Sequence, residues 1–389
     1  MIEVTGRYNK AVIYSDRYDE NAYKQIFEFC NLKSFEGSKI RIMPDYHAGA
    51  GCVIGFTADI ADAVIPNVVG VDIGCGVLAV KLNQPINPQQ LDEFIRNNIP
   101  SGFEVHETEQ GFYFDNLLCR AELANVEHLK KSLGTLGGGN HFIELNVDGK
   151  EYDCWLVVHT GSRNLGKQVA QFYQHIAEKT QGLTREEMRR ELTKIKPQER
   201  EKWLAKRKAE TKLPKGLEHL SGYLKDMYIH DMRICQSFAY HNRAAIVERI
   251  VNYFNITPTA IVESVHNYID IDNNIIRKGA IPAYTDQFCI IPLNMRDGSL
   301  LCKGKGNPDW NFSAPHGAGR LLSRSQAKEK ITLAEFKASM ADVYSTSVTE
   351  ATIDEAPMAY KPPEEIIEQI KDTVEIVDRL EPIYNFKAN

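Results

Sequence analysis

Short apolar runs, separated by glycine, proline and polar residues, set the pattern of much of the chain. Residues 38–80 hold several such runs in close succession, and further runs occupy 154–159, 260–269, 289–295 and 298–304. Apolar and β-branched runs of this length, bounded by turn residues, are typical of β-strands. The sequence therefore predicts strands joined by tight turns in residues 38–80 and one strand in each later segment.

Other segments place apolar residues at the spacing of one helix face. We predict helices in six segments: 88–98, 116–133, 164–180, 221–253, 332–342 and 362–379. Many short strands with segregated helices favour the α+β class, with a mixed or antiparallel sheet core flanked by helices. No repeat, low-complexity tract or linker divides the 389 residues, which are enough for one large domain or two.

Residues 183–212 differ from the rest of the chain because they are dense in charges of both signs. The segment reads LTREEMRRELTKIKPQEREKWLAKRKAETK and contains few apolar residues. Mixed charge along a helix is typical of a solvated surface. We interpret the segment, to about residue 215, as a solvated helical insertion rather than an RNA-binding element.

The overall composition, with 43% hydrophobic and 25% charged residues, is ordinary for a soluble globular protein. A net charge of −6 argues against a protein that coats nucleic acid by charge alone, although it is compatible with a local basic cleft. The eight cysteines form no CxxC pair, and we find neither a signal peptide nor an apolar segment long enough to cross a bilayer. We expect a cytoplasmic protein with free thiols and no membrane partner.

Five residues of metal-ligating type lie in apolar or glycine-rich surroundings. Asp72 and Cys75 share GVDIGCGV, His141 follows GTLGGGN, and His159 and His266 end apolar runs. Each alone could be structural, as an aspartate that caps a turn or a histidine satisfied in the core. Together, thiolate, imidazole and carboxylate suit a transition metal such as Mn²⁺, Zn²⁺ or Fe²⁺. The long separations and the absence of HExxH exclude a compact zinc finger and a zincin.

Standard nucleotide-binding motifs are absent. GSRNLGKQ, residues 161–168, nearly matches a P-loop, but Gln168 stands where a hydroxyl would bind Mg²⁺. The KxDG pattern of the lysine-dependent nucleic-acid ligases does not occur. Basic residues gather between Arg277 and Lys330, and they form either a phosphate-binding face or ordinary surface charge.

Residues 313–320, SAPHGAGR, surround His316 with proline and glycine. Glycine permits positive φ and a close approach of a bound group, and proline removes a backbone donor. By itself this pattern is also compatible with a surface turn.

These motifs, in this order and over nearly the full length, resemble the RNA-splicing ligases of the RtcB family, which join RNA ends with GTP and Mn²⁺. The resemblance is carried by a late tyrosine, a near-terminal lysine and the motifs MPDYHAGAG, GVDIGCGV, GTLGGGNHFIEL, VVHTGSRNLG, SVHN, RKGAIPA and KGKGNPDWNFSAPHGAGRLLSRSQAK. The chain departs from many relatives at Pro315, where they have cysteine. The resemblance implies an RtcB-like α+β fold in a single catalytic domain, residues 1–389.

The resemblance also implies a role for each candidate site residue. Two Mn²⁺ ions would be bound by Asp72, Cys75, His141, His159 and His266, with the Cys75 thiolate as a bridge. His316 would be the nucleophile that takes GMP, and Arg320 would support a phosphate or ribose beside it. The remaining implied contacts are Asn140, Glu144, Ser299, Tyr360 and Lys387 to the nucleotide, and Lys278, Asp45 and His47 to phosphates or RNA.

The implied activity is GTP-dependent joining of RNA 3′-phosphate or 2′,3′-cyclic phosphate ends to 5′-hydroxyl ends, in tRNA splicing or RNA repair. It would proceed through a histidine–GMP adduct and an RNA-(3′)pp(5′)G intermediate. The alternatives are a Mn²⁺-dependent phosphoesterase or cyclic phosphodiesterase acting on RNA ends, and a nucleotide or RNA sensor without catalysis. The natural RNA and the use of an archease-type activator stay open.

Overall fold

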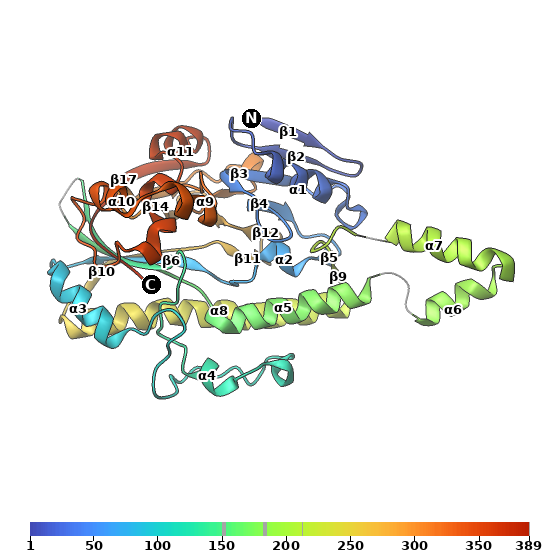
Figure 1. Cartoon of the computed structure of the whole chain (residues 1–389), viewed down its shortest axis with the longest axis horizontal. Coiled ribbons are helices and arrows are strands. Elements are labelled where there is room, and N and C mark those ends of the chain that lie inside the picture. The colour runs from blue at the N-terminus through green and yellow to red at the C-terminus, as the bar shows by residue number, and fades with distance from the viewer. Residues whose placement is uncertain (150–152, 182–184, 212, 389) are drawn as a thin grey trace.

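Two sheets form the centre of the computed structural model, which describes residues 1–149, 153–181, 185–211 and 213–388 (Figure 1). The first sheet has six strands, of which only β2 and β3 pair in parallel. Its order is β1 (Ile2–Thr5), β2 (Lys10–Ile13), β3 (Ile40–His47), β4 (Ile54–Asp59), β12 (Ile275–Lys278) and β11 (Asn267–Asp270). Strands distant in sequence are therefore neighbours in this sheet.

The second sheet has seven strands, and all of its pairs are antiparallel. Its order is β10 (Pro258–Val265), β6 (Gly76–Leu82), β8 (Cys154–Thr160), β7 (Phe142–Asp148), β17 (Val374–Lys387), β15 (Gly298–Gly304) and β14 (Phe288–Asn294). Two small ladders complete the strands: β13 (Ala280–Pro282) with β16 (Ser313–Pro315), and β5 (Ala63–Val64) with β9 (Leu220–Ser221). The predicted α+β class with a mixed and antiparallel sheet core is confirmed.

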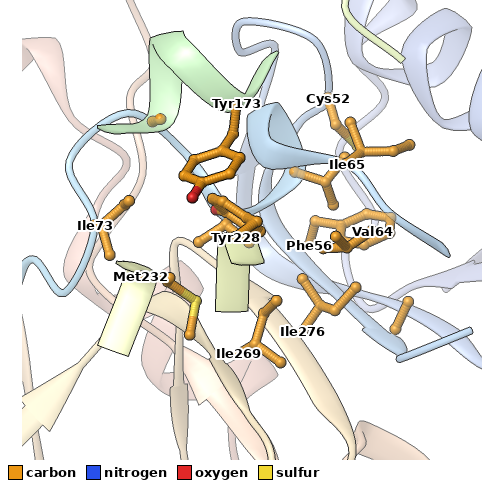
Figure 2. Packing of buried hydrophobic residues seen from close by; sticks show 14 of the residues in the cluster. Cys52, Phe56, Val64, Ile65, Ile73, Tyr173, Tyr228, Met232, Ile269 and Ile276 are labelled. Carbon is orange, nitrogen blue, oxygen red and sulfur yellow. The ribbon is translucent and has the colours of Figure 1, made fainter. Parts of the chain in front are cut away.

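The long helix α8 (Tyr223–Tyr253) supports both sheets from one side, next to α5 (Arg163–Thr180) (Figure 1). Its first half supplies Tyr228 and Met232 to the core that packs on the first sheet. Figure 2 shows these two side chains beside Tyr173 of α5 and the first-sheet residues Phe56 and Ile276. The second half supplies residues such as Ile246 and Ile250 to the core of the second sheet. One helix thereby fixes the two sheets relative to each other.

The remaining helices are shorter and lie around this centre. They are α1 (Glu20–Cys30), α2 (Pro66–Val69), α3 (Pro88–Asn98), α4 (Val126–Lys130), α6 (Arg185–Thr193), α7 (Arg200–Thr211), α9 (Arg324–Lys330), α10 (Leu333–Ser339) and α11 (Pro363–Gln369). In Figure 1, α6 and α7 of the charged segment project from the body as an arm. None of the described helices combines the length and the apolar character that crossing a membrane requires.

The predicted helix over 116–133 is wrong for most of its length. The structure has only a 3₁₀ turn at Arg120–Glu122 and the short α4 there. The buried carboxylate of Asp231 accepts hydrogen bonds from the backbone amides of Leu118 and Cys119, at 2.8 and 3.0 Å. These amides are bound to α8 by a tertiary contact, so they do not begin a helix of their own.

The predicted helix over 362–379 is correct only in its first half. Helix α11 ends at Gln369, and the chain then enters β17 at Val374. Strand β17 lies between β7 and β15, so both of its edges are paired. The segment from Val374 to Val377 is rich in β-branched residues and fits a strand as well as a helix face. Backbone pairing with both β7 and β15 favours the strand.

Candidate active site

One edge of the seven-stranded sheet brings together motifs that are far apart in sequence. The antiparallel register places Gly76 opposite both Thr160 and Val265, and Phe142 opposite both His159 and Lys387. The start of β6, the end of β8, the start of β7 and the end of β10 therefore meet at the same edge. Residues beside these ends share one site although no local spacing connects them.

His266 lies where the chain crosses from one sheet to the other. The sequence predicts a single strand over 260–269, but the structure divides it into β10 and β11, which belong to different sheets. The His266 backbone donates to the carbonyl of Cys75 at 2.9 Å and accepts from the amide of Gly279 at 2.6 Å. This break directs the His266 side chain toward the sheet edge instead of into a regular ladder.

The five predicted metal ligands form two overlapping groups that share Cys75. The first contains Cys75, His159 and His266, and the second contains Asp72, Cys75 and His141. Within each group the potential ligand atoms lie within 4.8 Å of one another. We call these five residues the Cys75 cluster. A thiol, three imidazoles and a carboxylate converging in this way fit a borderline transition metal.

Two rings of the Cys75 cluster are oriented by backbone carbonyls. His141 Nδ1 lies 2.9 Å from the carbonyl oxygen of Leu136, and His159 Nδ1 lies 3.2 Å from that of Asn140. A carbonyl can only accept, so Nδ1 carries the proton in both rings. His159 Nε2 then faces Cys75 Sγ at 3.4 Å, while His141 Nε2 lies 3.0 Å from Asp72 Oδ2 and 3.5 Å from Cys75 Sγ. Such outer contacts are the usual means of fixing metal-binding histidines.

Burial favours the neutral form of His159 and of His266. It lowers the pKa of His159 and of His266 well below the ordinary value, and nearby cationic and imidazole groups lower it further. Burial also raises the pKa of the Cys75 thiol well above its usual range. Neutral imidazoles are ready to bind a cation, whereas the thiol loses its proton when a cation takes its place.

His316 continues the row of rings from the Cys75 cluster. Ring centres of His159 and His266 are 5.2 Å apart, and those of His266 and His316 are 4.8 Å apart. On its other side, His316 Nδ1 lies 2.6 Å from Oδ2 of Asp45, a carboxylate with no solvent exposure. The carboxylate oxygen accepts a hydrogen bond from Nδ1–H, so Nε2 is left as the free nitrogen.

The glycine-rich loop around His316 lies against the backbone of Asp45. Gly319 has φ +74°, and a Cβ at this position would collide with the carbonyl of Asp45. The small residue allows the loop to follow β3 closely, which brings the His316 ring onto the Asp45 carboxylate. The loop is therefore a packing element of the site and not a free surface turn.

A second group of charged side chains surrounds Glu355, which is 2% exposed. Its Oε1 accepts from Arg324 at 2.7 Å and more distantly from Arg320, while its Oε2 accepts from Tyr360 at 2.6 Å and Lys387 at 2.9 Å. Burial by itself would raise the pKa of Glu355, but the charges of Lys387 and Arg324 outweigh it and lower the pKa to about 2. We call these five residues the Glu355 network.

Glu144 and Asn385 supply unpaired acceptors between the two groups. Asn385 donates to Oε2 of Glu144 at 2.6 Å. Among the described residues, neither Oε1 of Glu144 nor Oδ1 of Asn385 has a hydrogen-bond partner, although both atoms are buried. Burial raises the pKa of Glu144 to about 7, against the opposing hydrogen bond from Asn385. Buried acceptors without partners indicate a place for ligand donors.

All these groups meet at a cavity of about 290 Å³. This volume is close to the lower limit, roughly 300 Å³, of small-molecule sites. Of the residues predicted for the site, those that line the cavity are Asp72, Cys75, His159, His266, His316, Arg320, Asn140, Glu144, Tyr360, Lys387 and His47. His141 joins them through the Cys75 cluster, and Asp45 joins them behind His316.

Lys278 and Ser299 are not part of the cavity wall. The Lys278 ammonium is buried and donates to the carbonyls of Ala50, Cys52 and Asn67, at 2.6–3.0 Å. Ser299 is buried in β15, one residue from the cavity-lining Gly298. In this structure the Lys278 side chain is therefore placed to support backbone rather than to meet a phosphate.

Sequence reasoning missed Glu355, Asn385 and Lys361. Lys361 donates to the carbonyls of Pro44 and Tyr46, on either side of Asp45. Of the predicted basic face, Arg320 and Arg324 reach the cavity, whereas Arg277 is fully buried and paired with Asp270. The partners of Glu355 come from distant segments, so no local spacing identifies this buried charge. One local signal was available: the motif DEAPMAYK, which contains both Glu355 and Lys361.

Known proteins similar to this chain include RNA-splicing and tRNA-splicing ligases. A family model described as tRNA-splicing ligase RtcB matches residues 25–118 and 108–388. The chain is 30% identical over 392 residues to the RNA-splicing ligase RtcB of Escherichia coli (strain K12), which covers 90% of each protein. It is 27% identical over 480 residues to the tRNA-splicing ligase RtcB of Aeropyrum pernix, covering 96% of this chain and 94% of that protein.

Proposed function

Because the chain belongs to the RtcB family and is an RNA ligase, we propose that it joins 3′-phosphate or 2′,3′-cyclic phosphate ends of RNA to 5′-hydroxyl ends through a guanylylated His316. The observation that carries this proposal is the His316–Asp45 pair beside the Cys75 cluster. A His–Asp pair can also serve as a general base, and it is the family membership that favours its use here as a nucleophile.

The donor set fits Mn²⁺, and two ions that share Cys75 are part of the proposal. Asp72 and His141 would hold one ion, and His159 and His266 the other. Bound metal would supply charge neutralisation of the phosphates. The protein itself holds the imidazoles, and a thiol that can lose its proton to a metal, beside the nucleophile His316.

GTP is the proposed cosubstrate because the cavity offers acceptors at Glu144 and Asn385 and a donor at Lys387. The Watson–Crick edge of guanine presents two donor groups and one acceptor, which complements this set. Adenine presents one donor group beside an acceptor and leaves more of these groups unpaired. Tyr360 and Asn140 would complete the nucleotide contacts.

In the first step, His316 Nε2 attacks the α-phosphorus of GTP. The P–N bond forms as the bond to the bridging oxygen breaks, and pyrophosphate leaves. The ring then carries positive charge, which Asp45 stabilises through the Nδ1 proton. Arg320 lies near enough to compensate phosphate charge.

Two transfers of phosphoryl groups complete the reaction. An oxygen of the RNA 3′-phosphate, formed where needed by opening of the cyclic phosphate, attacks the adduct, and the P–N bond breaks to give RNA-(3′)pp(5′)G. The RNA 5′-hydroxyl then attacks the 3′-phosphorus, loses its proton, and GMP leaves. RNA repair and tRNA splicing both supply such ends.

Cellular context and domain organisation belong to the same proposal. All eight cysteines are free in the structure, which supports a reducing compartment such as the cytoplasm. Cavity residues come from both sheets and from the last strand, which supports a single catalytic domain over residues 1–389 with the charged arm outside the site. The use of an archease-type activator by this enzyme is tested by adding such a protein to the assay described below.

The test is transfer of label from α-³²P-GTP to the enzyme in the presence of Mn²⁺. We expect acid-labile label on the wild type and none on His316→Ala. Asp45→Asn should still carry label on His316, formed about 100-fold more slowly, because the neutral amide no longer stabilises the charged ring. Label on His316→Ala would refute the proposal. Release of 3′-phosphate ends without label or joining would support the phosphoesterase instead.

A further inference from the structure

Phe103 is an aromatic side chain that the fold does not use for its own packing. It is 97% exposed, more than any other large apolar side chain in the described part of the chain. Burying a phenylalanine typically stabilises a fold by about 1.5–3 kcal/mol. This residue contributes nothing of that kind, so its ring is available for a contact outside the folded chain.

The turn that carries Phe103 is firmly anchored. The amide of Glu104 donates to the Ser101 carbonyl at 3.0 Å, and the amide of Gly102 donates to the Gly137 carbonyl at 3.0 Å. Arg163 Nη2 donates to the Gly102 carbonyl, also at 3.0 Å. Hydrogen bonds on both sides of Gly102 fix the backbone from which the ring projects.

This turn lies on the loop that leads into the cavity. A Cβ on Gly138 would come 3.8 Å from the Gly102 Cα. Asn140, which lines the cavity, follows two residues later, at most about 7 Å of chain away. A Cβ on Gly139 would lie 3.6 Å from Nη2 of Arg324, a partly exposed cation that also lines the cavity. An exposed ring and an exposed guanidinium thus border the same glycine loop.

We propose that Phe103 is a stacking platform for an unpaired base next to the RNA end that enters the cavity. The proposal rests on the proposed function, because it takes the His316 cavity as the place where RNA ends are joined. Ends that enter a cavity leave their neighbouring bases unstacked, and aromatic side chains replace the lost stacking without sequence preference. Arg324, with Lys328 one helical turn away, would meet the adjoining phosphates.

The experiment compares Phe103→Ala, Phe103→Trp and Phe103→Leu in the full-length enzyme. We expect Phe103→Ala to raise the KM for RNA in ligation about tenfold, the equivalent of about 1.4 kcal/mol. The rate of guanylylation from GTP, which requires no RNA, should be unchanged. Phe103→Trp should retain the wild-type KM, whereas Phe103→Leu, apolar but without a π face, should resemble alanine.

A binding readout separates stacking from a general loss of activity. RNA carrying 2-aminopurine next to its 3′-phosphate should lose fluorescence on binding the wild type and not on binding Phe103→Ala. Tyr223→Ala is the matched control, because Tyr223 is 74% exposed but lies far from the glycine loop. It is about 28 Å along α8 from Asn242, whose side chain accepts a hydrogen bond from the amide of Gly134, just before that loop. It should change neither KM nor fluorescence.

The two proposals fail in distinguishable ways. Absence of label on wild-type His316 would refute the proposed function. Normal guanylylation together with a KM for RNA unchanged within twofold in Phe103→Ala would overturn the stacking role alone, and would assign Phe103 to a protein partner or to plain surface. Equal KM values for Phe103→Leu and Phe103→Trp would also overturn it, since stacking requires the ring.

Discussion

The Cys75 cluster and the Glu355 network face the same cavity but position their side chains by different means. In the Cys75 cluster, the carbonyls of Leu136 and Asn140 hold the rings of His141 and His159. In the Glu355 network, one buried carboxylate holds Tyr360, Lys387 and Arg324 through side-chain contacts. The carbonyls remain when a neighbouring side chain is replaced, whereas all other members of the network share Glu355 as a partner. The cluster should therefore fail one ligand at a time, and the network should fail as a unit.

The largest effect is expected from Cys75→Ser, because Cys75 belongs to both ligand groups. Bound Mn²⁺ should fall and guanylylation should slow by at least about 100-fold, measured by elemental analysis after loading and by label transfer. Cys154→Ser is the control, because it changes a buried thiol on the same strand as His159, about 17 Å away. Full metal content in Cys75→Ser would mean that the thiol is not a ligand.

Glu355→Gln should weaken GTP binding about tenfold while bound Mn²⁺ stays unchanged. The neutral amide leaves the buried ammonium of Lys387 without its charge partner, and removal of one member of a buried pair is costly. Calorimetry with GTP and elemental analysis give the two values. The control is Glu350→Gln, an exposed carboxylate at the start of the same 3₁₀ segment Glu350–Glu355, which should change GTP binding less than threefold. Equal loss of metal in Glu355→Gln would show that the two groups are not independent.

The pH dependence of GTP binding should separate Glu144 from Glu355. The pKa of Glu144 is raised to about 7, so its carboxylate acquires a proton as the pH falls from 8 to 6 and accepts guanine donors less well. The Kd for GTP should rise severalfold over this range. The pKa of Glu355 is lowered to about 2, so it stays ionised and contributes no change there. Glu144→Gln should make the profile flat, and a slope retained in that variant would place the titrating group elsewhere.

Lys278→Met should affect stability and leave ligand binding alone. The substitution leaves three buried carbonyls without their shared donor, which should lower the free energy of unfolding by about 1–3 kcal/mol in denaturant titrations. Mn²⁺ content and the Kd for GTP should not change, because the ammonium does not reach the cavity. Lys303→Met, at an exposed ion pair with Asp286, should change stability by less than about 0.5 kcal/mol. A weaker GTP affinity in Lys278→Met would restore the predicted phosphate contact.

The hydrophobic pattern located several of the long elements from the sequence alone. The helices α3, α5 and α8 and the strands β8, β14 and β15 lie where the pattern predicts them, within two residues. The pattern failed in residues 116–133 and 362–379, where a buried carboxylate and an open place in a sheet outweighed local preference. Apolar spacing reports burial on one face, and several tertiary arrangements satisfy it.

For the site, the sequence by itself supplied the metal-ligating residue types and indicated that the five members of the Cys75 cluster form one set. The structure brings all five to one place. Only the tertiary structure decided which group acts on which. It placed Asp45 behind His316, turned Lys278 toward backbone carbonyls, and made Glu355 the centre of a network of charged side chains from distant segments. The physical reason is that a buried charge must find partners within about 3 Å, and those partners come from whatever strand the fold brings there.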